Sequence, residues 1–578
     1  MNPWTVWGLA ALAFWMIASG LDDLFIGFVS LFPRRFRWPS EADLKTATER
    51  RTAIFVPLWQ EHRVIGRMLE RNLAAIRYAN YDVFVGVYPN DPATARVVQG
   101  IAVRHERVHL ALAPHDGPTS KGDCLNAIHA AMTEHERRCG VRFEIVITHD
   151  AEDVVHPRAL SLINWFSREY EMVQVPVLAL ATGLGELTHG LYCDEFAEFQ
   201  TKDIPVRQRL GGFLPSNGVG TGFERAALER LAETRGGRIF APECLTEDYE
   251  NGYALHALGY RQIFVPVRCE AGGPVATREY FPRQWTGAIR QRSRWVAGIA
   301  LQGWQRHGWR APLRQLYWFW RDRKGLVGNL LSPAANLVFL YGLAGWRLPA
   351  ATPRWLSTVC TAVLGMSLVQ LTFRTRASAR IYGWKFAAGV PLRALWGNAV
   401  NWVATAAALR LFFAAVRRSA APAWNKTEHV YPAVEQRRPL LGEVLLRMRA
   451  LDAGELAAAL AGKAPGVRLG EHLVAARKLS EEELYRALSI QAGIPLGRPP
   501  QVVVDRAAAR ALPGETVRRW KVLPYRVQDG QLHVATTEVP SPEMTQALAS
   551  IAALDLHFRL VRPGDFAALA LACGWKTV

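Results

Sequence analysis

Acidic side chains that follow apolar segments are the first residues in this sequence that could do chemistry. Asp150 and Glu152 come directly after the apolar run Phe143–Thr148 and alternate along the chain. In an extended chain, both carboxylates can face one hard divalent cation, Mg2+ or Mn2+. Such a cation on a diphosphate would stabilise the negative charge of a departing nucleotide. An acidic pair at the end of a strand is also common in solvated loops, so the pair alone leaves both interpretations open.

Other polar residues follow similar apolar runs. Pro57 and Glu61 lie at and just after the end of the first run, and Asp91 follows the second. The carboxyl ends of strands are where α/β sheets bind nucleotides. Lys121 lies in a segment of small and polar residues and offers a positive charge to a nucleotide. These four residues are therefore candidates for contact with a nucleotide donor.

Two later segments carry a potential base and potential phosphate ligands. Asp248 closes the run Thr246–Asp248, and a carboxylate can take a proton in an inverting displacement. Residues 291–295 read Gln-Arg-Ser-Arg-Trp. Arginine forks match phosphate oxygens, and an indole face suits the apolar face of a sugar ring. The same run would alternatively be a basic helix face that reaches toward lipid headgroups.

The order of these segments is more specific than any one of them. Together, with apolar regions on both sides, they resemble the catalytic domain of membrane-embedded family 2 glycosyltransferases with the GT-A fold, the type that includes cellulose and hyaluronan synthases. The resemblance covers about residues 50–300. It implies a metal-dependent, inverting hexosyltransferase that uses a nucleotide-activated sugar, here a UDP-sugar.

The resemblance also implies a role for each residue. Asp248 would be the general base, and Asp150 with Glu152 would hold the cation. Glu152 stands where many relatives have Asp, which leaves the preferred metal open. The donor would contact Pro57, Glu61, Asp91, Lys121, Asp150 and Arg292. The diphosphate would contact Gln291 and Arg294, and the acceptor would contact Trp295, Gly220 and Thr221. The glycine-rich segment 218–222 is alternatively a simple turn into the next helix.

Short apolar runs that alternate with helical stretches must position these residues. Four of the runs are Ala53–Pro57, Val83–Tyr88, Val108–Ala113 and Phe143–Thr148. Strand-length runs alternating with helices are typical of an α/β domain with a mostly parallel sheet. We therefore expect a cytoplasmic, Rossmann-like GT-A domain over residues 50–320.

Apolar segments on both sides of this domain predict membrane attachment. Residues 1–33 contain a run long enough to span a bilayer, and Arg34, Arg35 and Arg37 follow it. By the positive-inside rule, the next domain is then cytoplasmic. Asp22 and Asp23 inside the run are costly in a membrane and indicate a functional site, the end of a shorter span, or pairs with a neighbouring arginine.

Residues 325–417 are a second apolar region. We expect a transmembrane hairpin over 325–346 and 354–373, with basic residues at both of its flanks. Residues 383–417 carry basic residues and tryptophans, which fits either two short spans or interfacial or re-entrant helices. The segment 424–429 that follows is either a loop that closes over the donor, as in polysaccharide synthases, or an ordinary linker.

The C-terminal region, residues 430–578, contains two similar 24-residue copies at 440–463 and 468–491. They resemble the MshEN-type cyclic-di-GMP domain and would be followed by a shorter α+β stretch. The resemblance implies that the ligand contacts Arg468, Leu469, Gly470, Leu473 and Gln491, and in the first copy Leu441, Gly442 and Leu445. The first copy has Leu440 and Lys463 where arginine and glutamine are expected. The alternative is a helical docking module with ordinary leucine packing.

The composition of the chain limits the classes of ligand and the compartments that are expected for it. The net charge of +18 suits nucleic acid, anionic lipid or diphosphate, but the basic residues cluster at membrane flanks, which argues against nucleic acid. The seven scattered cysteines form no C-x-x-C pair, which suits a reducing cytoplasm. We expect a bacterial inner-membrane enzyme of exopolysaccharide biosynthesis that extends an exported glycan under cyclic-di-GMP control.

Such an enzyme would meet membrane lipids, a glycan or lipid-linked acceptor, and an export partner in the periplasm or outer membrane. Two alternatives stay open. The first is a single-addition transferase that loads a polyprenyl phosphate. The second is a degenerate enzyme that serves as a cyclic-di-GMP sensor or scaffold.

Overall fold

A computed structural model describes the chain from residue 3 to residue 575, apart from 34–35, 271–272, 345–352, 419–430, 432–439, 449, 465, 493, 500–503, 529–530 and 553. The segment 424–429, for which a closing loop is one prediction, lies outside the described residues. The chain divides into two compact units, Met1–Pro432 and Ala433–Val578, and each is described by itself.

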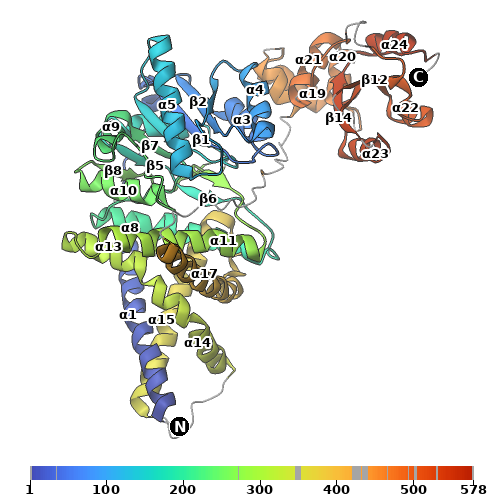
Figure 1. Ribbon diagram of the computed structural model, residues 1–578. Coiled ribbons are helices and arrows are strands. Elements are labelled where there is room, and N and C mark those ends of the chain that lie inside the picture. Colours follow the sequence, from blue (N-terminus) through green and yellow to red (C-terminus); the bar gives the residue numbers. More distant parts are fainter. Residues whose placement is uncertain are drawn as a thin grey trace. The chain divides into compact units, whose positions relative to one another are not determined.

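A seven-stranded mixed sheet forms the centre of the first unit (Figure 1). Its strand order is β3-β2-β1-β4-β7-β5-β8. The strands are β1 Thr52–Pro57, β2 Tyr81–Val87, β3 Val108–Leu112, β4 Ile145–Thr148, β5 Met172–Gln174, β7 Thr221–Glu224 and β8 Gln262–Phe264. β7 runs antiparallel to both of its neighbours, and the other pairs are parallel. The predicted α/β, GT-A-like domain is confirmed, and β1 to β4 fall on the four predicted runs.

The sheet has a hydrophobic core on each face. Along β1, Ile54 and Val56 belong to one buried cluster, and Ala53 and Phe55 belong to the other, because successive side chains of a strand point to opposite faces. The covering helices are α3 Ile65–Ala75, α4 Pro92–Ala102, α5 Lys121–Cys139, α6 Ala159–Phe166, α9 Arg225–Glu233 and α10 Glu247–Ala257.

Helix boundaries in this unit follow local capping chemistry. The Ser120 side chain accepts a hydrogen bond from the Asp123 amide and begins α5, as an N-cap serine does. Gly140, at φ 66°, ends the same helix, because glycine adopts this left-handed conformation without strain. Lys121 is therefore the first residue of α5.

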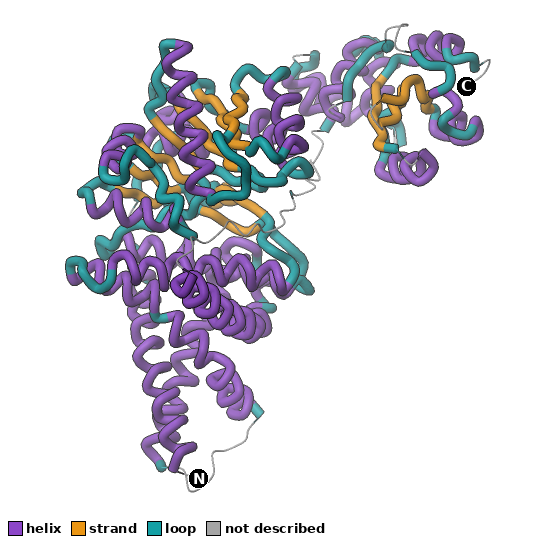
Figure 2. Tube along the Cα trace, in the orientation of Figure 1, coloured by secondary structure: helices purple, strands orange, loops and turns teal. Residues whose placement is uncertain are grey.

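A layer of helices lies beside the sheet (Figure 2). It contains α7 Leu187–Glu198, α8 Ile204–Arg209, α11 Trp285–Trp295, α12 Gly303–His307 and α13 Leu313–Arg323, with π-helical turns at Phe199–Asp203 and Val296–Gln302. Short strands border it, namely β6 Val177–Ala179, β9 Cys269–Glu270, β10 Gly273–Pro274 and β11 Thr277–Glu279. A short helix, α2 Glu41–Thr46, precedes the sheet.

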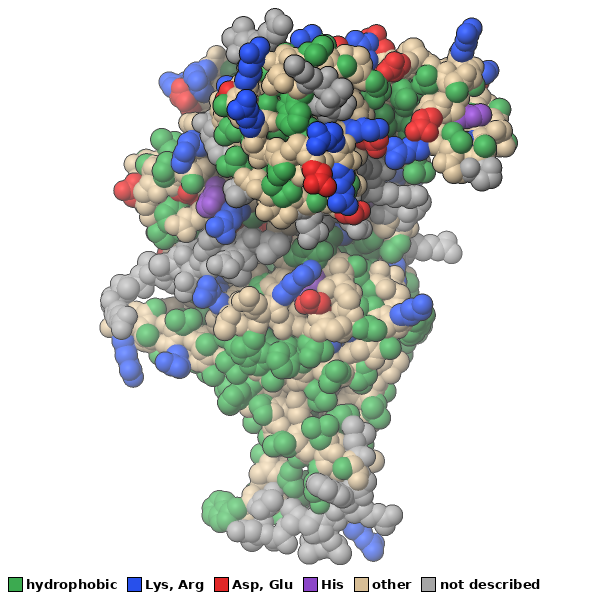
Figure 3. All heavy atoms as spheres, turned by 90° about the vertical axis from the view of Figure 1, so that its right-hand side faces the viewer, with side chains coloured by type: hydrophobic (Ala, Val, Ile, Leu, Met, Phe, Trp, Pro, Cys, Tyr) green, Lys and Arg blue, Asp and Glu red, His purple; other side chains and the backbone are tan. Residues whose placement is uncertain are grey.

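Three described helices are long and apolar enough to cross a membrane: Val6–Ser30 of α1 (Pro3–Ser30), α15 (Arg354–Tyr382), and Val390–Arg417 of α17 (Val390–Arg418). α1 packs along α15, and α14 (Gly325–Leu343) packs along α17 (Figure 1). Hydrophobic side chains gather over this part of the surface, and Lys and Arg side chains lie mainly nearer the sheet domain (Figure 3). The chain is therefore a membrane protein.

Residues 383–417 do not form two short spans, which is one of the two expected arrangements. After the short helix α16 (Trp384–Ala387), the structure has one continuous helix, α17, in place of two short spans. The arginine Arg393 of α17 lies inside the protein. It is 1% exposed and pairs with Asp194 at 2.6 Å. One of the basic residues of this segment therefore binds the catalytic domain.

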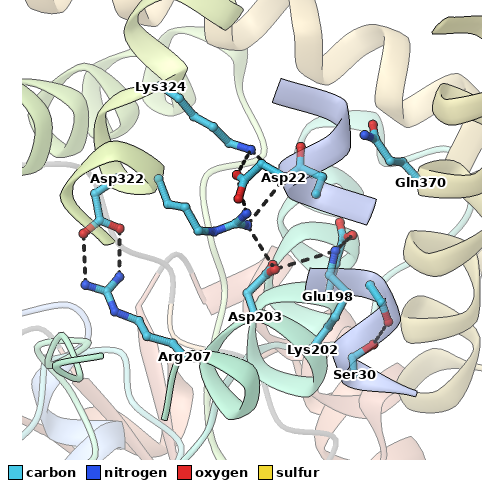
Figure 4. Close-up of polar contacts among 12 residues, drawn as sticks. Asp22, Ser30, Glu198, Lys202, Asp203, Arg207, Asp322, Lys324 and Gln370 are labelled. Atoms are coloured by element: carbon cyan, nitrogen blue, oxygen red, sulfur yellow. Dashed lines mark hydrogen bonds and ion pairs between the residues drawn. The ribbon is translucent and has the colours of Figure 1, made fainter. Parts of the chain in front are cut away.

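Asp22 and Asp23 form ion pairs, which is one of the three predicted alternatives. Asp22 lies 2.5 Å from Arg321 and 2.8 Å from Lys324, and Asp23 lies 2.6 Å from Lys324. Tyr317 donates a further hydrogen bond to Asp22. Figure 4 shows Asp22 of α1 beside Lys324 at the end of α13. The acidic pair therefore holds the N-terminal helix to the catalytic unit.

The second unit joins four short helices to a three-stranded sheet. The helices are α18 Leu441–Arg447, α19 Ala453–Gly462, α20 Leu469–Ala475 and α21 Glu481–Ala492. The sheet contains β12 Val522–Gln528, β13 Gln531–Thr536 and β14 Asp555–Leu560, with α22 Gly514–Trp520, α23 Pro542–Ala552 and α24 Pro563–Ala572 around it. Each predicted copy forms one pair of helices, and the predicted α+β stretch follows.

Candidate active site

Lys121 and Asp150 form the centre of the site at the carboxyl edge of the sheet. Lys121 begins α5, and Asp150 follows β4. The Lys121 ammonium lies 2.6 Å from Asp150 Oδ1 and 4.0 Å from Glu247 Oε1. The sequence placed both residues at a nucleotide site, and the structure brings them into direct contact.

Asp248 lies beside the same ammonium group. A Cβ atom at Gly218 would lie 2.7 Å from Asp248 Oδ2 and 3.5 Å from Lys121 Nζ. Gly218 also has a φ of +77°, which favours glycine. The glycine-rich segment 218–222 therefore lets the backbone approach the candidate base closely.

A π-helical turn holds the acidic run in place. A Cβ atom at Gly298 would lie 2.5 Å from Thr246 Oγ1, and Gln302 accepts a hydrogen bond from the Leu245 amide. The turn, Val296–Gln302, continues directly from α11. Such turns occur often at functional sites. The run with Asp248 and the helix with residues 291–295 are thus one packed assembly.

Burial and neighbouring charges change the acidity of this group. Burial and the adjacent Asp248 carboxylate raise the pKa of Glu247 to about 7. Burial also raises the pKa of Asp248, against the opposing charges of Lys121 and Arg294. Although burial opposes it, the carboxylates of Asp150, Glu247 and Asp248 raise the pKa of Lys121. Lys121 therefore stays positively charged beside Asp248. The raised pKa of Asp248 suits a group that accepts a proton.

The structure separates the two arginines of residues 291–295. The charge of Arg294 lowers the pKa of both Glu247 and Asp248, so Arg294 lies near these two carboxyl groups. Arg292 is buried and pairs with Glu195 of α7 at 2.7 Å. It also donates to Asn401 of α17 and lies over the Tyr192 ring. Arg292 thus joins three helices and is not brought to the Lys121 cluster.

Gln291 and Trp295 lie on the same helix in different surroundings. Trp295 is half-buried and packs edge-on against Tyr192 and Phe281, which leaves part of the indole open to a ligand. Gln291 is buried, and its Oε1 atom has no hydrogen-bond partner among the described residues. A buried amide oxygen of this kind is costly unless a ligand or water satisfies it.

Carboxyl groups that suit a divalent cation gather after β4. Glu152 is buried, and Asp153 is held by a 2.6 Å hydrogen bond with His149. Burial and the charges of Glu152, Asp153 and Asp150 raise the pKa of Glu279 well above its usual range. A cation would relieve this repulsion, and oxygen donors are those that Mg2+ and Mn2+ prefer. The carboxyl groups of this region therefore have the chemistry that a divalent cation needs, and Asp150 and Glu152 stay the predicted ligands.

The ends of β1 and β2 form the neighbouring part of the edge. Pro57 ends β1 and is buried, as is Glu61. Asp91 caps α4 through Thr94 and accepts a 2.6 Å hydrogen bond from the Gln60 amide. Its carboxylate thus already holds the loop after β1 to α4. Asn90 bonds twice to Gly117, in the loop before Lys121, so this part adjoins the Lys121 site.

Gly220 and Thr221 lie where strand β7 of the sheet begins. Gly220 has a φ of +59°, and Thr221 begins β7. Thr221 is fully buried, and its hydroxyl donates to Gln174 at 2.7 Å. These two residues shape the loop that carries Gly218 and do not present side chains to the cluster.

The predicted cyclic-di-GMP residues divide into exposed and buried sets. Arg468 is exposed and lies 3.4 Å from Glu538. Leu445 and Leu473 are in the helical core, and Leu441 and Leu469 pack against it. Gln491 is half-buried.

The glycines of the two copies occupy matching positions. Gly470 lies against Leu484, and Gly442 lies against Leu456, each so closely that a Cβ atom would come within 3 Å of the leucine. The glycines therefore permit helix packing in both copies.

Sequence reasoning missed several residues of the site. Glu279 lies far along the chain from Asp150, and an isolated glutamate in a short strand gives no signal. Glu195 and Tyr192, which hold Arg292, are equally unmarked. The sequence marks the glycine-rich segment that contains Gly218, but the contact between Gly218 and Asp248 depends on the fold.

Comparisons with known proteins agree with this architecture. Residues 50–298 match the model of the glycosyltransferase-like family 2, and residues 492–572 match that of the MshEN domain. The bacteriophage adsorption protein B of Escherichia coli (strain K12) is 34% identical over an alignment of 598 positions, which covers 96% of this chain and 80% of that protein. The bacteriophage N4 adsorption protein B of Escherichia coli O157:H7 shows the same identity and coverage.

Solved structures show more distant likeness. A mannosyltransferase from Pyrobaculum calidifontis, in complex with GDP-Man and Mn2+, is 18% identical with a TM-score of 0.42 and covers 67% of this chain and 99% of its own. A structure of MshE with cyclic di-GMP is 25% identical with a TM-score of 0.21 and covers 22% of this chain and 94% of its own.

Proposed function

The chain belongs to the family of bacteriophage adsorption protein B and is a family 2 glycosyltransferase with an MshEN domain, and we propose that it transfers a hexosyl group from a UDP-sugar to a growing exported polysaccharide. The transfer inverts the anomeric carbon and is controlled by cyclic di-GMP. One observation carries this proposal, which is that Lys121, Asp150 and Asp248 meet beside Gly218.

Asp248 acts as the general base. Its carboxylate takes the proton of the acceptor hydroxyl, whose oxygen then attacks the anomeric carbon as the bond to the nucleotide breaks. Burial raises the pKa of Asp248, which makes it a stronger base than an exposed aspartate. Gly218 keeps the approach to Asp248 Oδ2 free of a side chain.

The positive side chains serve the departing nucleotide. Lys121 and Arg294 lie near the acids and offer charge-assisted bonds to phosphate oxygens. A divalent cation held by Asp150 and Glu152 would neutralise charge that develops on the leaving diphosphate. Trp295 offers part of its indole face to the acceptor sugar.

We place the enzyme in a bacterial inner membrane, with the sheet domain of the first unit and the whole second unit in the cytoplasm. Arg37 after α1, and Arg321 and Lys324 before α14, support this orientation by the positive-inside rule. An export partner beyond the membrane would then receive the product.

Nucleotide release from a panel of UDP-sugars tests this function. Purified full-length protein with Mg2+ or Mn2+ should release UDP from one donor. Asp248→Asn should lower that rate at least 100-fold, within the range for loss of a general base. Glu233→Gln, at an exposed carboxylate in the last turn of α9, is the control and should keep full activity. Equal rates for both variants would exclude Asp248 as the base.

A single addition to a lipid-linked acceptor such as a polyprenyl phosphate is a second candidate. The three candidate spans in the described residues favour it, because a chain-extending enzyme that exports its own product needs a protein-lined path. Product length decides between the two, since a ladder of products indicates extension and one product indicates single addition.

A further inference from the structure

A groove runs along the catalytic-domain end of α15. Its larger part holds about 610 Å³ and is lined by Leu368, Leu371, Thr372, Thr375, Arg376 and Trp384. An adjoining hollow of about 360 Å³ shares Arg376 and Trp384 and adds Arg380. The lining residues of α15 recur every three to four positions, so they form one face of the helix.

The character of this face changes along the helix. Leu368 is 46% exposed and lies within the apolar span, whereas Arg376 and Arg380 are exposed near its end. Eight residues of helix separate Leu368 from Arg376, a distance of about 12 Å. Half of a bilayer's hydrocarbon core is about 15 Å thick. The groove thus has the length and polarity of a lipid from acyl chain to headgroup.

The two arginines are available for a ligand. No carboxylate in the described part of the chain forms an ion pair with either, and Arg380 makes one long hydrogen bond, 3.4 Å, to the Val267 carbonyl. Arg374, two residues earlier, differs because it pairs with Glu198 at 2.7 Å. The same helix therefore satisfies one arginine internally and leaves two facing the groove.

Trp384 closes the groove at the same level. Its side chain is 71% exposed, and an exposed indole at the end of a span is typical of the membrane interface. Thr372 and Thr375 already donate to helix carbonyls, so the guanidinium groups are the polar groups open to a headgroup.

From this geometry we propose that the groove binds one anionic phospholipid of the inner leaflet. Its phosphate lies between Arg376 and Arg380, where guanidinium forks form charge-assisted bonds. One acyl chain lies along Leu371 and Leu368, and Trp384 packs at headgroup depth. This inference does not depend on the identity of the donor or acceptor sugar.

Native mass spectrometry of the full-length protein tests the site, with dioleoyl phosphatidylglycerol and dioleoyl phosphatidylcholine as probes. The wild type should retain one phosphatidylglycerol in preference to phosphatidylcholine. Arg376→Gln/Arg380→Gln should weaken that retention roughly tenfold or more, since each basic residue near a headgroup adds to affinity. Arg376→Lys/Arg380→Lys keeps the charge and should retain most of the preference.

Arg354→Gln is the matched control, because Arg354 is an exposed arginine at the opposite end of the same helix. It should bind phosphatidylglycerol as the wild type does. Melting temperatures of all variants should agree, which separates lost binding from misfolding. Equal retention of both lipids, wild-type binding by the double glutamine variant, or an equal loss in Arg354→Gln would overturn the proposal. Displacement of the lipid by inorganic phosphate, or by a second copy of the chain, would overturn it too.

Discussion

Lys121 lies among three carboxyl groups, and its charge controls the acidity of the candidate base. Burial raises the pKa of Asp248, and the Lys121 ammonium partly opposes that rise. A base acts in its ionised form, so activity should rise with pH as Asp248 loses its proton. Because the pKa is raised, this limb should lie above the usual range of an aspartate. Lys121→Met should move the limb to higher pH, and Lys121→Arg should leave it in place.

The measurement is the dependence of kcat on pH for the three proteins with a saturating donor. The position of the limb matters rather than its height, because Lys121→Met also loses a donor contact. A limb that moves to lower pH in Lys121→Met would contradict the role given to the ammonium.

Arg292 and Arg294 differ in surroundings, so their substitution should have different effects. Arg292→Gln breaks the pair with Glu195, which is 24% exposed, and should lower the free energy of unfolding by about 1–3 kcal/mol. Arg294→Gln should lower kcat with little change in melting temperature, because Arg294 acts on the catalytic acids. Thermal melts and UDP release on both variants check this. A drop in kcat without loss of stability for Arg292→Gln would place Arg292 in the site instead.

At the scale of residues, the sequence predicted which candidate side chains lie together better than it predicted their ion-pair partners. Asp150, Lys121 and Asp248 stand in recognisable runs, and the structure brings them together. The pairing of Arg292 with Glu195 could not be predicted, since the two residues lie on helices that meet only in the fold. Local spacing contains no information about such a contact.

Among the elements, the loop before β7 brings its backbone close to the candidate base at Gly218. Gly218→Ala would place a methyl group 2.7 Å from Asp248 Oδ2 at a φ of +77°. Gly259→Ala is the matched control, because Gly259 has a φ of +87° with no atom within 4 Å of a Cβ position. Both variants should lose about 1–2 kcal/mol of stability from left-handed strain. Only Gly218→Ala should also lower kcat, by roughly tenfold or more, since the methyl group displaces the base. Equal kcat values for the two variants would show that the close approach has no catalytic role.

The elements themselves were predicted unevenly. β1 to β4 coincide with apolar runs, because buried parallel strands are apolar on both faces. The antiparallel position of β7 between β4 and β5 could not be predicted, since strand direction depends on long-range pairing. The continuous α17 was obscured by Arg393, whose charge is neutralised by Asp194.

Partly and fully buried ion pairs hold the sheet domain and its helical layer to the membrane helices within the first unit. Asp22 and Asp23 of α1 meet Arg321 and Lys324, and Arg374 of α15 meets Glu198. Figure 4 shows Asp22 beside Lys324. Buried pairs of this kind fix orientation more than they add stability. α1 and α15 thus have a defined position against the layer that contains α11, which is the helix of residues 291–295.

The proposed control by cyclic di-GMP would involve the molecule as a whole, since the ligand would bind one unit and act on the other. Arg468 is an exposed cation at the start of the second copy, and its only ion pair among the described residues is a solvent-exposed one with Glu538. Such a pair contributes little stability, so Arg468→Ala should fold normally. It should weaken cyclic-di-GMP binding about tenfold or more, because a charge-assisted bond is worth about 1.5–3 kcal/mol. Arg486→Ala, at an exposed arginine of α21, should bind as the wild type does.

The same variants connect binding to catalysis. If cyclic di-GMP controls the enzyme, saturating ligand should change the rate of UDP release in the wild type and in Arg486→Ala, and should have no effect on Arg468→Ala at the same concentration. Calorimetry gives the affinities, and the release assay gives the rates. Ligand that binds the wild type without changing its rate would separate the second unit from control of the transferase. The sequence supports such control only through the order of the two units, so the rate comparison is the decisive measurement.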